Sequence, residues 1–239
     1  MGVPDVGPLL AIGRSADVFE CGPGRVLRRY RPSADADAAR DVAYEAAVMR
    51  HVRAAGYPVP AVHDADRLDL VMDRVDGPTM LQVMARRPWL IRRMADVLAD
   101  LHRRLHAIEP AEWYRPEFGG GPAILHMDLH PLNVLMTDGG PVVIDWPNAR
   151  SGPGAADVAH TWIVVATASP TGRVERALAK VGRSAFLRRF LSHFDRSDLL
   201  SQLPAVSHRW LSDRNVAQPE REATARFLKQ VGVPGPPVV

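Results

Sequence analysis

The sequence predicts an α+β fold in two parts, a small β-rich lobe with one helix and a larger, mainly helical lobe. Between residues 9 and 71, short β-like stretches bounded by turn residues surround a single helical pattern. After Gly77 and Pro78, the apolar residues recur with helical spacing. We therefore expect a first lobe over residues 1–72, a connector over 73–77 and a second lobe over 78–239.

The first lobe is expected to form a sheet with one helix. Short β-like runs predict five strands, and Cys21–Gly24 has the glycine and proline residues of a hairpin turn. Ser33 can cap a helix that runs to about Ala54, and Gly56 ends it. The predicted strands are Leu9–Ile12, Asp17–Glu20, Arg25–Tyr30, Val62–Ala65 and Asp69–Met72.

The second lobe is expected to consist mostly of helices. Two short apolar runs, Ile124–Leu135 and Val142–Asp145, are separated by the turn Thr137–Gly140 and predict extended segments. The predicted helices are Thr79–Arg86, Trp89–Ala107, Ala155–Thr167, Val174–Lys180 and further pieces up to Lys229.

The composition is that of a globular protein. The chain has 239 residues, of which 46% are hydrophobic and 24% charged, so it can bury a core without covalent staples. Its single cysteine excludes a disulfide framework and a cysteine-based zinc or iron–sulfur site. The sequence has neither a signal-peptide pattern nor an apolar run near the ~20 residues that span a bilayer. We expect a cytoplasmic protein without a membrane partner, a monomer or weak dimer.

The basic residues do not predict nucleic-acid binding. All of them except Lys180 and Lys229 are arginine, which is typical of a GC-rich genome. They form no dense stripe with interleaved aromatic residues, as a nucleic-acid groove would require. Residues 151–239 carry 12 basic and 7 acidic residues, so a polycationic ligand would find few carboxylates there.

The strongest functional signal is the segment His126–Asn133, followed by an apolar strand that ends at Asp145. A loop between two short strands can direct a carboxylate and a carboxamide into one cleft. Asp128 is placed to orient an acceptor hydroxyl and take its proton. Asn133 and Asp145 supply hard oxygen ligands, which suit Mg²⁺ bound to phosphates.

These residues resemble those of the aminoglycoside phosphotransferase and choline kinase group, the small-molecule branch of the protein-kinase-like fold. The resemblance covers roughly residues 9–165 and rests on Leu125–Leu135, Val142–Trp146 and Gly152–Val158. It implies a bilobal kinase-like fold, with a small antiparallel sheet and one helix in the first lobe. It also implies transfer of phosphate from ATP, or GTP, to a small hydroxylated molecule with Mg²⁺.

The resemblance also implies roles for residues of the second lobe. Asp128 matches the catalytic base, while Asn133 and Asp145 match the magnesium ligands. Asp157 matches a buried aspartate that braces the catalytic loop, and His126 is expected to support the same loop.

In the first lobe, the resemblance implies a nucleotide site. Met72, Asp73, Arg74 and Val75 match the hinge whose backbone meets adenine, and Glu45 matches the helix glutamate that pairs with a nucleotide-binding lysine. Arg28 stands where that lysine is expected, and a guanidinium can donate two hydrogen bonds to phosphate. The expected glycine-rich loop contains Gly13 and Ser15 but has only one glycine between Ile12 and Val18.

Simpler interpretations of these residues remain open at this stage. Asp128 and Glu45 could be solvated surface residues, Asn133 a turn residue, and Asp145 or Asp157 a charge at a helix start. Arg28 could be a surface strand residue, with its neighbour Arg29 in the nucleotide-facing position instead. His102 and His106 have the i, i+4 spacing of a metal-binding pair, but we expect a surface pair because no third ligand is evident.

Three functions compete. The leading one is an Mg²⁺-dependent small-molecule kinase, whose acceptor is either an antibiotic or a metabolite. The second is a nucleotide-binding protein of the same fold without transferase activity, which the arginine at position 28 and the reduced loop favour. The third, a nucleic-acid-binding module, would require salt-dependent binding to DNA or RNA.

Overall fold

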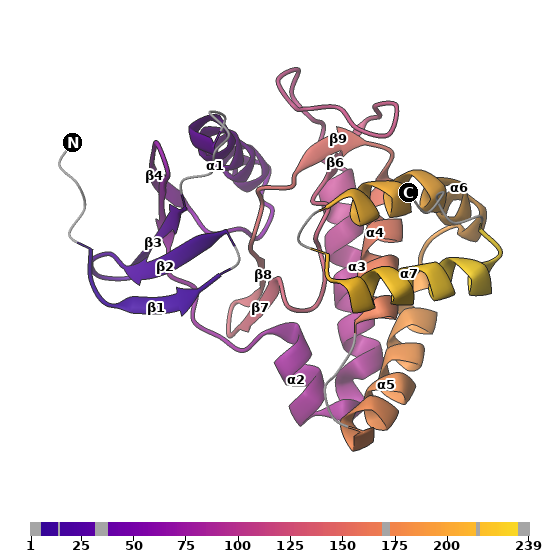
Figure 1. Cartoon of the computed structure of the whole chain (residues 1–239). Helices are drawn as coiled ribbons and strands as arrows, with labels where there is room; N and C mark the ends of the chain where they lie inside the picture. The colour runs from indigo at the N-terminus through magenta and orange to yellow at the C-terminus, as the bar shows by residue number, and fades with distance from the viewer. Residues whose placement is uncertain (1–5, 14, 32–37, 169–172, 214–215, 234–239) are drawn as a thin grey trace. The chain divides into compact units, whose positions relative to one another are not determined.

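The computed structural model describes residues 6–13, 15–31, 38–168, 173–213 and 216–233 (Figure 1). Contacts divide the chain into two compact units. Unit 1 comprises Met1–Pro78 with Val134–Ala149, and unit 2 comprises Thr79–Asn133 with Arg150–Val239. Unit 1 carries an antiparallel sheet and unit 2 is mainly helical, so the predicted α+β class is confirmed.

The sheet of unit 1 has five antiparallel strands in the order β1-β2-β3-β5-β4. One helix, α1 (Ala38–Ala54), packs along β4 and β5. All five strands agree with the sequence prediction to within a residue, whereas the predicted cap Ser33 lies outside the described residues. The strands are β1 (Leu9–Ile12), β2 (Ala16–Glu20), β3 (Arg25–Tyr30), β4 (Val62–Asp66) and β5 (Asp69–Asp73).

Strand β3 is central in this sheet, and its side chains alternate between two faces. Leu27 is buried in a small cluster with Cys21 and Val71. Its neighbour Arg28 is largely buried on the other face, where its side chain is 13% exposed. Arg29 is 40% exposed and binds Asp69 through two hydrogen bonds of 2.8 and 2.7 Å. The alternation therefore separates the two arginines into different environments.

The segment 134–149 joins unit 1 although it is distant in sequence. It begins as the hairpin of β7 (Val134–Thr137) and β8 (Gly140–Val143). The Val143 N–H donates to the Pro58 carbonyl at 2.8 Å, and the Tyr44 hydroxyl donates to the Ala149 carbonyl at 3.0 Å. Between these anchors, the fully buried Trp146 meets Tyr57 edge to face, with the ring centroids 5.7 Å apart.

Unit 2 is built around a bundle of helices, in which α3 and α5 lie side by side (Figure 1). A capping box between Thr79 and Gln82 starts the first helix. The helices are α2 (Met80–Arg86), η1 (Pro88–Leu90), α3 (Ile91–His106), α4 (Gly154–Thr167), α5 (Arg173–Leu191), α6 (Arg196–Ser212) and α7 (Gln218–Val231). Two short strands, β6 (Ala123–Leu125) and β9 (Arg150–Gly152), form an antiparallel pair, and α4 follows β9 in the sequence. None of the described helices combines the length and apolar character that a membrane crossing requires.

The prediction that His102 and His106 form a surface pair on α3 is wrong. His102 is fully buried, and the side chain of His106 is only 15% exposed. The periodicity explains the error, because His102 lies on the same buried face as Leu98 and Leu105. The arginines that suggested an exposed helix lie on its other faces.

Trp146 should be a principal source of stability in unit 1. Its removal creates a cavity in a place that the anchored backbone cannot fill, so Trp146→Ala should lower the free energy of unfolding by about 3–5 kcal/mol. Trp89 is 75% exposed, and Trp89→Ala should change stability by less than ~0.5 kcal/mol. Urea denaturation of both variants measures the difference, and equal effects would contradict the packing described.

Candidate active site

A buried carboxylate, Glu45, organises the charged groups of unit 1. Glu45 is 1% exposed and lies on α1. It accepts a hydrogen bond from Arg28 Nη1 at 3.0 Å, another from the Tyr30 hydroxyl, and a third from the Trp146 N–H at 3.3 Å. Burial raises the pKa of Glu45, and the charge of Arg28 and the hydrogen bond from Tyr30 oppose this shift.

Arg28 binds two carboxylates at once. Its Nη2 donates to Asp145 Oδ1 at 2.6 Å, while Nη1 donates to Glu45. Burial disfavours the charged guanidinium, but the two carboxylates outweigh it and raise the pKa of Arg28. The guanidinium also lies over the Tyr30 ring, 4.9 Å from its centroid. The structure thus brings together three residues that the sequence analysis proposed for the nucleotide site and its metal.

A left-handed backbone conformation at Asp145 sets the position of its side chain. Asp145 has φ of 71°, a conformation that costs a non-glycine residue about 1 kcal/mol. This turn follows β8 and lets two consecutive residues serve different partners: Asp145 accepts from Arg28, and Trp146 donates to Glu45. The side chain of Asp145 is still 37% exposed.

The predicted hinge residues lie at the end of β5. The backbone N–H groups of Asp73 and Arg74 donate to the carbonyls of Ala61 and Gly24, both at 2.9 Å. The Asp73 carboxylate binds His63 Nε2 at 2.7 Å. Burial opposes ionisation of Asp73, but the hydrogen bond from His63 prevails and lowers its pKa. Backbone carbonyls are therefore the groups of Asp73 and Arg74 that could still meet a nucleotide base.

The predicted loop residues Gly13 and Ser15 lie in the connection between β1 and β2. The Gly13 N–H donates to the Ala16 carbonyl at 2.9 Å, and a Cβ on Gly13 would lie 2.6 Å from that oxygen. The Ser15 carbonyl accepts from the Arg31 N–H at 3.0 Å. This turn is held by its own backbone bonds, and its role toward phosphate stays a prediction.

In unit 2, Asp128 is held by two neighbours on its own loop. Asn133 Nδ2 donates to the Asp128 carboxylate at 3.0 Å and to its carbonyl at 2.9 Å. His130 Nε2 lies 3.2 Å from the other carboxylate oxygen. Burial favours the neutral acid, but the contact with His130 prevails and lowers the pKa of Asp128. Asp128 is therefore an oriented carboxylate that is ionised at neutral pH. Both hydrogen bonds from Asn133 to Asp128 use the amide nitrogen, so neither involves Asn133 Oδ1.

Asp157 braces the segment that precedes Asp128. It is fully buried at the start of α4 and accepts the N–H groups of His126 at 3.2 Å and Met127 at 2.7 Å. Met127 has φ of 60°, so this backbone turn needs such a fixed acceptor. Burial opposes ionisation, but the imidazoles of His102 and His106 hold the pKa of Asp157 well below its usual range. Asp157 and His126 are both fully buried, and their support of a catalytic loop stays a prediction.

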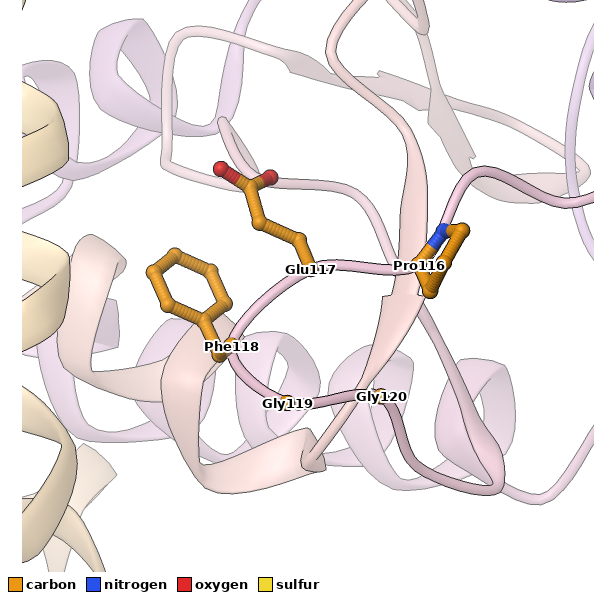
Figure 2. A pocket seen from close by; sticks show the side chains of 5 residues that line it. All are labelled: Pro116, Glu117, Phe118, Gly119 and Gly120. Atoms are coloured by element: carbon orange, nitrogen blue, oxygen red, sulfur yellow. The ribbon is translucent and has the colours of Figure 1, made fainter.

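A pocket of about 360 Å³ opens at the loop Pro116–Gly120 (Figure 2). Glu117 and Phe118 extend their side chains from this loop, and the two glycines follow. Glu117 accepts a hydrogen bond from Arg209 Nε at 2.6 Å and lies 3.7 Å from Arg150 Nε. The acidic group of this pocket is thus neutralised by arginines of the same unit.

The pKa of His160 is affected by the charges of Asp128 and of Arg209, which binds Glu117 of this pocket. Burial lowers the pKa of His160 to about 4, against the charge of Asp128 and with that of Arg209. Its ring meets Trp210 edge to face at 5.4 Å. The sequence analysis missed His160, because a lone histidine in an apolar helix carries no spacing signal.

Two further contacts were missed, and both carried a signal. Tyr30 follows Arg28 by two residues on one strand face, so the alternation could have placed it against Glu45 as well. His130 is part of the segment that contains Asp128, and its ring reaches the carboxylate across one short turn. Asn133 belongs to unit 2 and Asp145 to unit 1, and their joint binding of one metal ion stays a prediction.

Comparison with known proteins identifies a family. The chain matches the model of the phosphotransferase enzyme family over residues 7–121 and again over residues 104–196. It is 28% identical over 180 residues to a probable serine/threonine-protein kinase of Streptomyces coelicolor. This match covers 69% of the chain but 25% of the relative, so the chain spans about a quarter of that protein's length.

Solved structures share the fold. The complex of streptomycin and ATP with APH(2'')-IIa gives a TM-score of 0.61 at 14% identity, covering 86% of this chain and 83% of that one. Amicoumacin kinase in complex with AMP-PNP and Ca²⁺ gives a TM-score of 0.54 at 14% identity, covering 97% and 90%. The expected kinase-like fold and the resemblance to aminoglycoside phosphotransferases are therefore confirmed.

His160 should make the protein less stable in mild acid. The pKa of His160 is lowered from 6.5 to about 4 in the folded chain, so between these values the unfolded state binds the proton more readily. Stability should therefore fall as the pH drops, by about 2 kcal/mol between pH 7 and pH 5 from this residue. Urea denaturation at both pH values should show a smaller loss in His160→Gln. The exposed His208→Gln should behave as the wild type, and an unchanged slope in His160→Gln would contradict this account.

Proposed function

Because the chain belongs to the phosphotransferase enzyme family, we propose that it transfers the γ-phosphoryl group of ATP to a hydroxyl group of a small molecule. The proposal follows the predicted division into a nucleotide lobe, a hinge at residues 73–77 and an acceptor lobe. The observation that supports it most is Asp128, an ionised carboxylate oriented on both sides by its own loop.

Asp128 acts as the base toward the acceptor. Asn133 and His130 hold the carboxylate, so it does not have to be oriented when the acceptor binds. An ionised carboxylate can accept a hydrogen bond from the acceptor hydroxyl and take its proton as the oxygen attacks phosphorus. Asp157 keeps the backbone before Asp128 in its turn, which preserves this orientation.

The donor set fits Mg²⁺. Asn133 offers a carboxamide oxygen and Asp145 a half-exposed carboxylate, and both are the hard oxygen ligands that Mg²⁺ prefers. Asp145 and Asn133 would hold the ion, which neutralises phosphate charge when bound. Arg28 engages one oxygen of Asp145, so the second oxygen is the atom that Asp145 would offer.

Arg28 is proposed to contact the phosphates of the nucleotide. Glu45 and Asp145 hold the guanidinium on a fixed face of β3. A guanidinium has five N–H donors, so it can bind these carboxylates and still donate to a phosphate oxygen. The hinge carbonyls at the end of β5 would meet the base, whether adenine or guanine.

The acceptor is proposed to be a neutral hydroxylated molecule. The pocket at Pro116–Gly120 lies in the same unit as Asp128, and its carboxylate Glu117 is already paired with Arg209 and Arg150. A polycationic antibiotic would have to displace these arginines, whereas a sugar or amino alcohol with one or no positive charge would not. A panel of hydroxylated compounds, read by the mass gain of one phosphoryl group, tests this choice.

One observation favours a second function, nucleotide binding without transfer. In the 2.6 Å ion pair, Arg28 binds the carboxylate of Asp145, the same carboxylate that the metal ion of a metal–nucleotide complex would bind. If the ion pair persists when nucleotide binds, ATP should bind equally well with and without Mg²⁺. Formation of ADP that depends on an acceptor would exclude this second function.

Asp128→Asn should abolish transfer and preserve nucleotide binding. The amide keeps the shape of the side chain but cannot take a proton, so kcat should fall by ~10²–10⁴-fold. Coupled detection of ADP measures kcat, and calorimetry with the nucleotide measures binding. Turnover near the wild-type rate would show that Asp128 is not the base.

Arg28→Ala should weaken the use of ATP at least tenfold, because the loss of one charge-assisted hydrogen bond exceeds the ~1.4 kcal/mol that equals one decade. Arg29→Ala is the matched control, since it removes the same charge from the other face of β3 and should leave kcat/KM within about twofold. Thermal unfolding of both variants separates the loss of Glu45's partner from a loss of folding. If Arg29→Ala is the impaired variant, the nucleotide lies on the opposite face of the sheet.

A further inference from the structure

Behind the catalytic loop, two imidazoles and one carboxylate converge on a single oxygen. His102 and His106 lie one turn apart on α3, and Asp157 lies in the first turn of α4. His106 Nε2 is 3.1 Å and His102 Nδ1 is 3.4 Å from the same atom, Asp157 Oδ2. The donor atoms of these three side chains all lie within 4.8 Å of one another.

The Thr161 hydroxyl, which contacts Nε2 of His102, fixes which ring nitrogen of His102 carries the proton. The Thr161 hydroxyl has one proton, and two carbonyls lie near it, that of Leu129 at 2.7 Å and that of Asp157 at 3.2 Å. Carbonyls only accept, so the hydroxyl proton goes to the nearer one. His102 Nε2, 3.2 Å from the same hydroxyl oxygen, must then be the donor in that contact.

This arrangement leaves a lone pair at His102 Nδ1. An imidazole with its single proton on Nε2 presents an acceptor at Nδ1. Nδ1 is buried and makes no hydrogen bond of acceptable geometry, and it faces the carboxylate oxygen of Asp157. Two acceptors that face each other at 3.4 Å in a buried place repel each other, and a positive group between them, either a proton on Nδ1 or a metal ion, removes this repulsion.

From this geometry we propose that His102 Nδ1, His106 Nε2 and Asp157 Oδ2 bind one divalent transition-metal ion of the zinc type. Zinc binds imidazole and carboxylate at ~2.0–2.1 Å, which places tetrahedral ligands about 3.4 Å apart. The two contacts to Asp157 Oδ2 are already close to this spacing, and the two nitrogens lie within 4.8 Å of each other. Three protein ligands leave a fourth position for water.

The neighbourhood of His106 is shaped for its ring. A Cβ on Gly154, the first residue of α4, would lie 2.7 Å from His106 Nδ1. Any larger residue at this position would displace the imidazole. Gly154 is therefore a small residue that makes room for the second nitrogen ligand.

The metal would support the catalytic loop without touching the substrate. Asp157 is also the acceptor for the N–H groups of His126 and Met127, directly before Asp128. An ion on Asp157 Oδ2, the oxygen that also accepts the His126 N–H, would fix the side chain that holds this backbone segment. This role differs from that of Mg²⁺ at Asn133 and Asp145, whose ligands are oxygens only.

Metal titration of the full, tag-free chain tests the proposal. The chain is stripped with a chelator and titrated with Zn²⁺ or Co²⁺ in excess Mg²⁺, which occupies oxygen-only sites. We expect one ion per chain, the intense visible bands of tetrahedral Co²⁺, and a rise in Tm with Zn²⁺. Absence of stoichiometric binding would overturn the proposal and leave a proton on His102 Nδ1 as the positive group.

Variants locate the site. His106→Asn removes a partly exposed ligand, so it should fold and lose at least tenfold in Zn²⁺ affinity together with the Co²⁺ bands. Gly154→Ala should weaken binding in the same direction by displacing the ring. His208→Asn removes an exposed histidine of α6 and should bind as the wild type. Equal affinity in His106→Asn, or equal loss in His208→Asn, would show that the ion binds elsewhere.

Discussion

A fully buried carboxylate must find its partners inside the protein, and in unit 1 this requirement falls on Glu45. Its three donors come from different parts of the chain: Arg28 and Tyr30 from β3, and the Trp146 backbone from the segment after β8. A single side chain on α1 thereby fixes the central strand and the loop that carries Asp145. The helix, the sheet and the candidate metal ligand are positioned by the same charge.

Unit 2 also contains a buried carboxylate whose partners all lie inside the protein, that of Asp157. Asp157 is also fully buried, and its partners are two backbone N–H groups and two imidazoles. Because the backbone groups belong to the residues before Asp128, Asp157 and the proposed base Asp128 are linked through three consecutive residues. A buried acid is costly unless every lone pair is used, so these positions tolerate little change.

The arginine at position 28 changes the chemistry of unit 1. A lysine ammonium is a point charge, whereas a guanidinium is a planar fork that can bind two carboxylates in fixed directions. Arg28 uses this geometry to link Glu45 with Asp145. The link gives Asp145 a partner within the chain itself, so the proposed binding of a metal–nucleotide complex would draw on the same carboxylate as this internal ion pair.

Local patterns determined most of the fold and singled out the candidate site residues. Strand alternation placed Arg28 and Arg29 on opposite faces, and the spacing from His126 to Asn133 indicated the candidate catalytic loop, because both depend only on neighbours in the chain. The environment of His102, His160 and Glu117 was decided by the tertiary structure alone. Their partners are Asp157, Asp128 and Arg209, which lie 32 to 92 positions away in the sequence, and only packing of the helices and loops brings such groups into contact. Whether a histidine is a solvated surface group or a buried ligand depends on those contacts, so no spacing within one helix could reveal it.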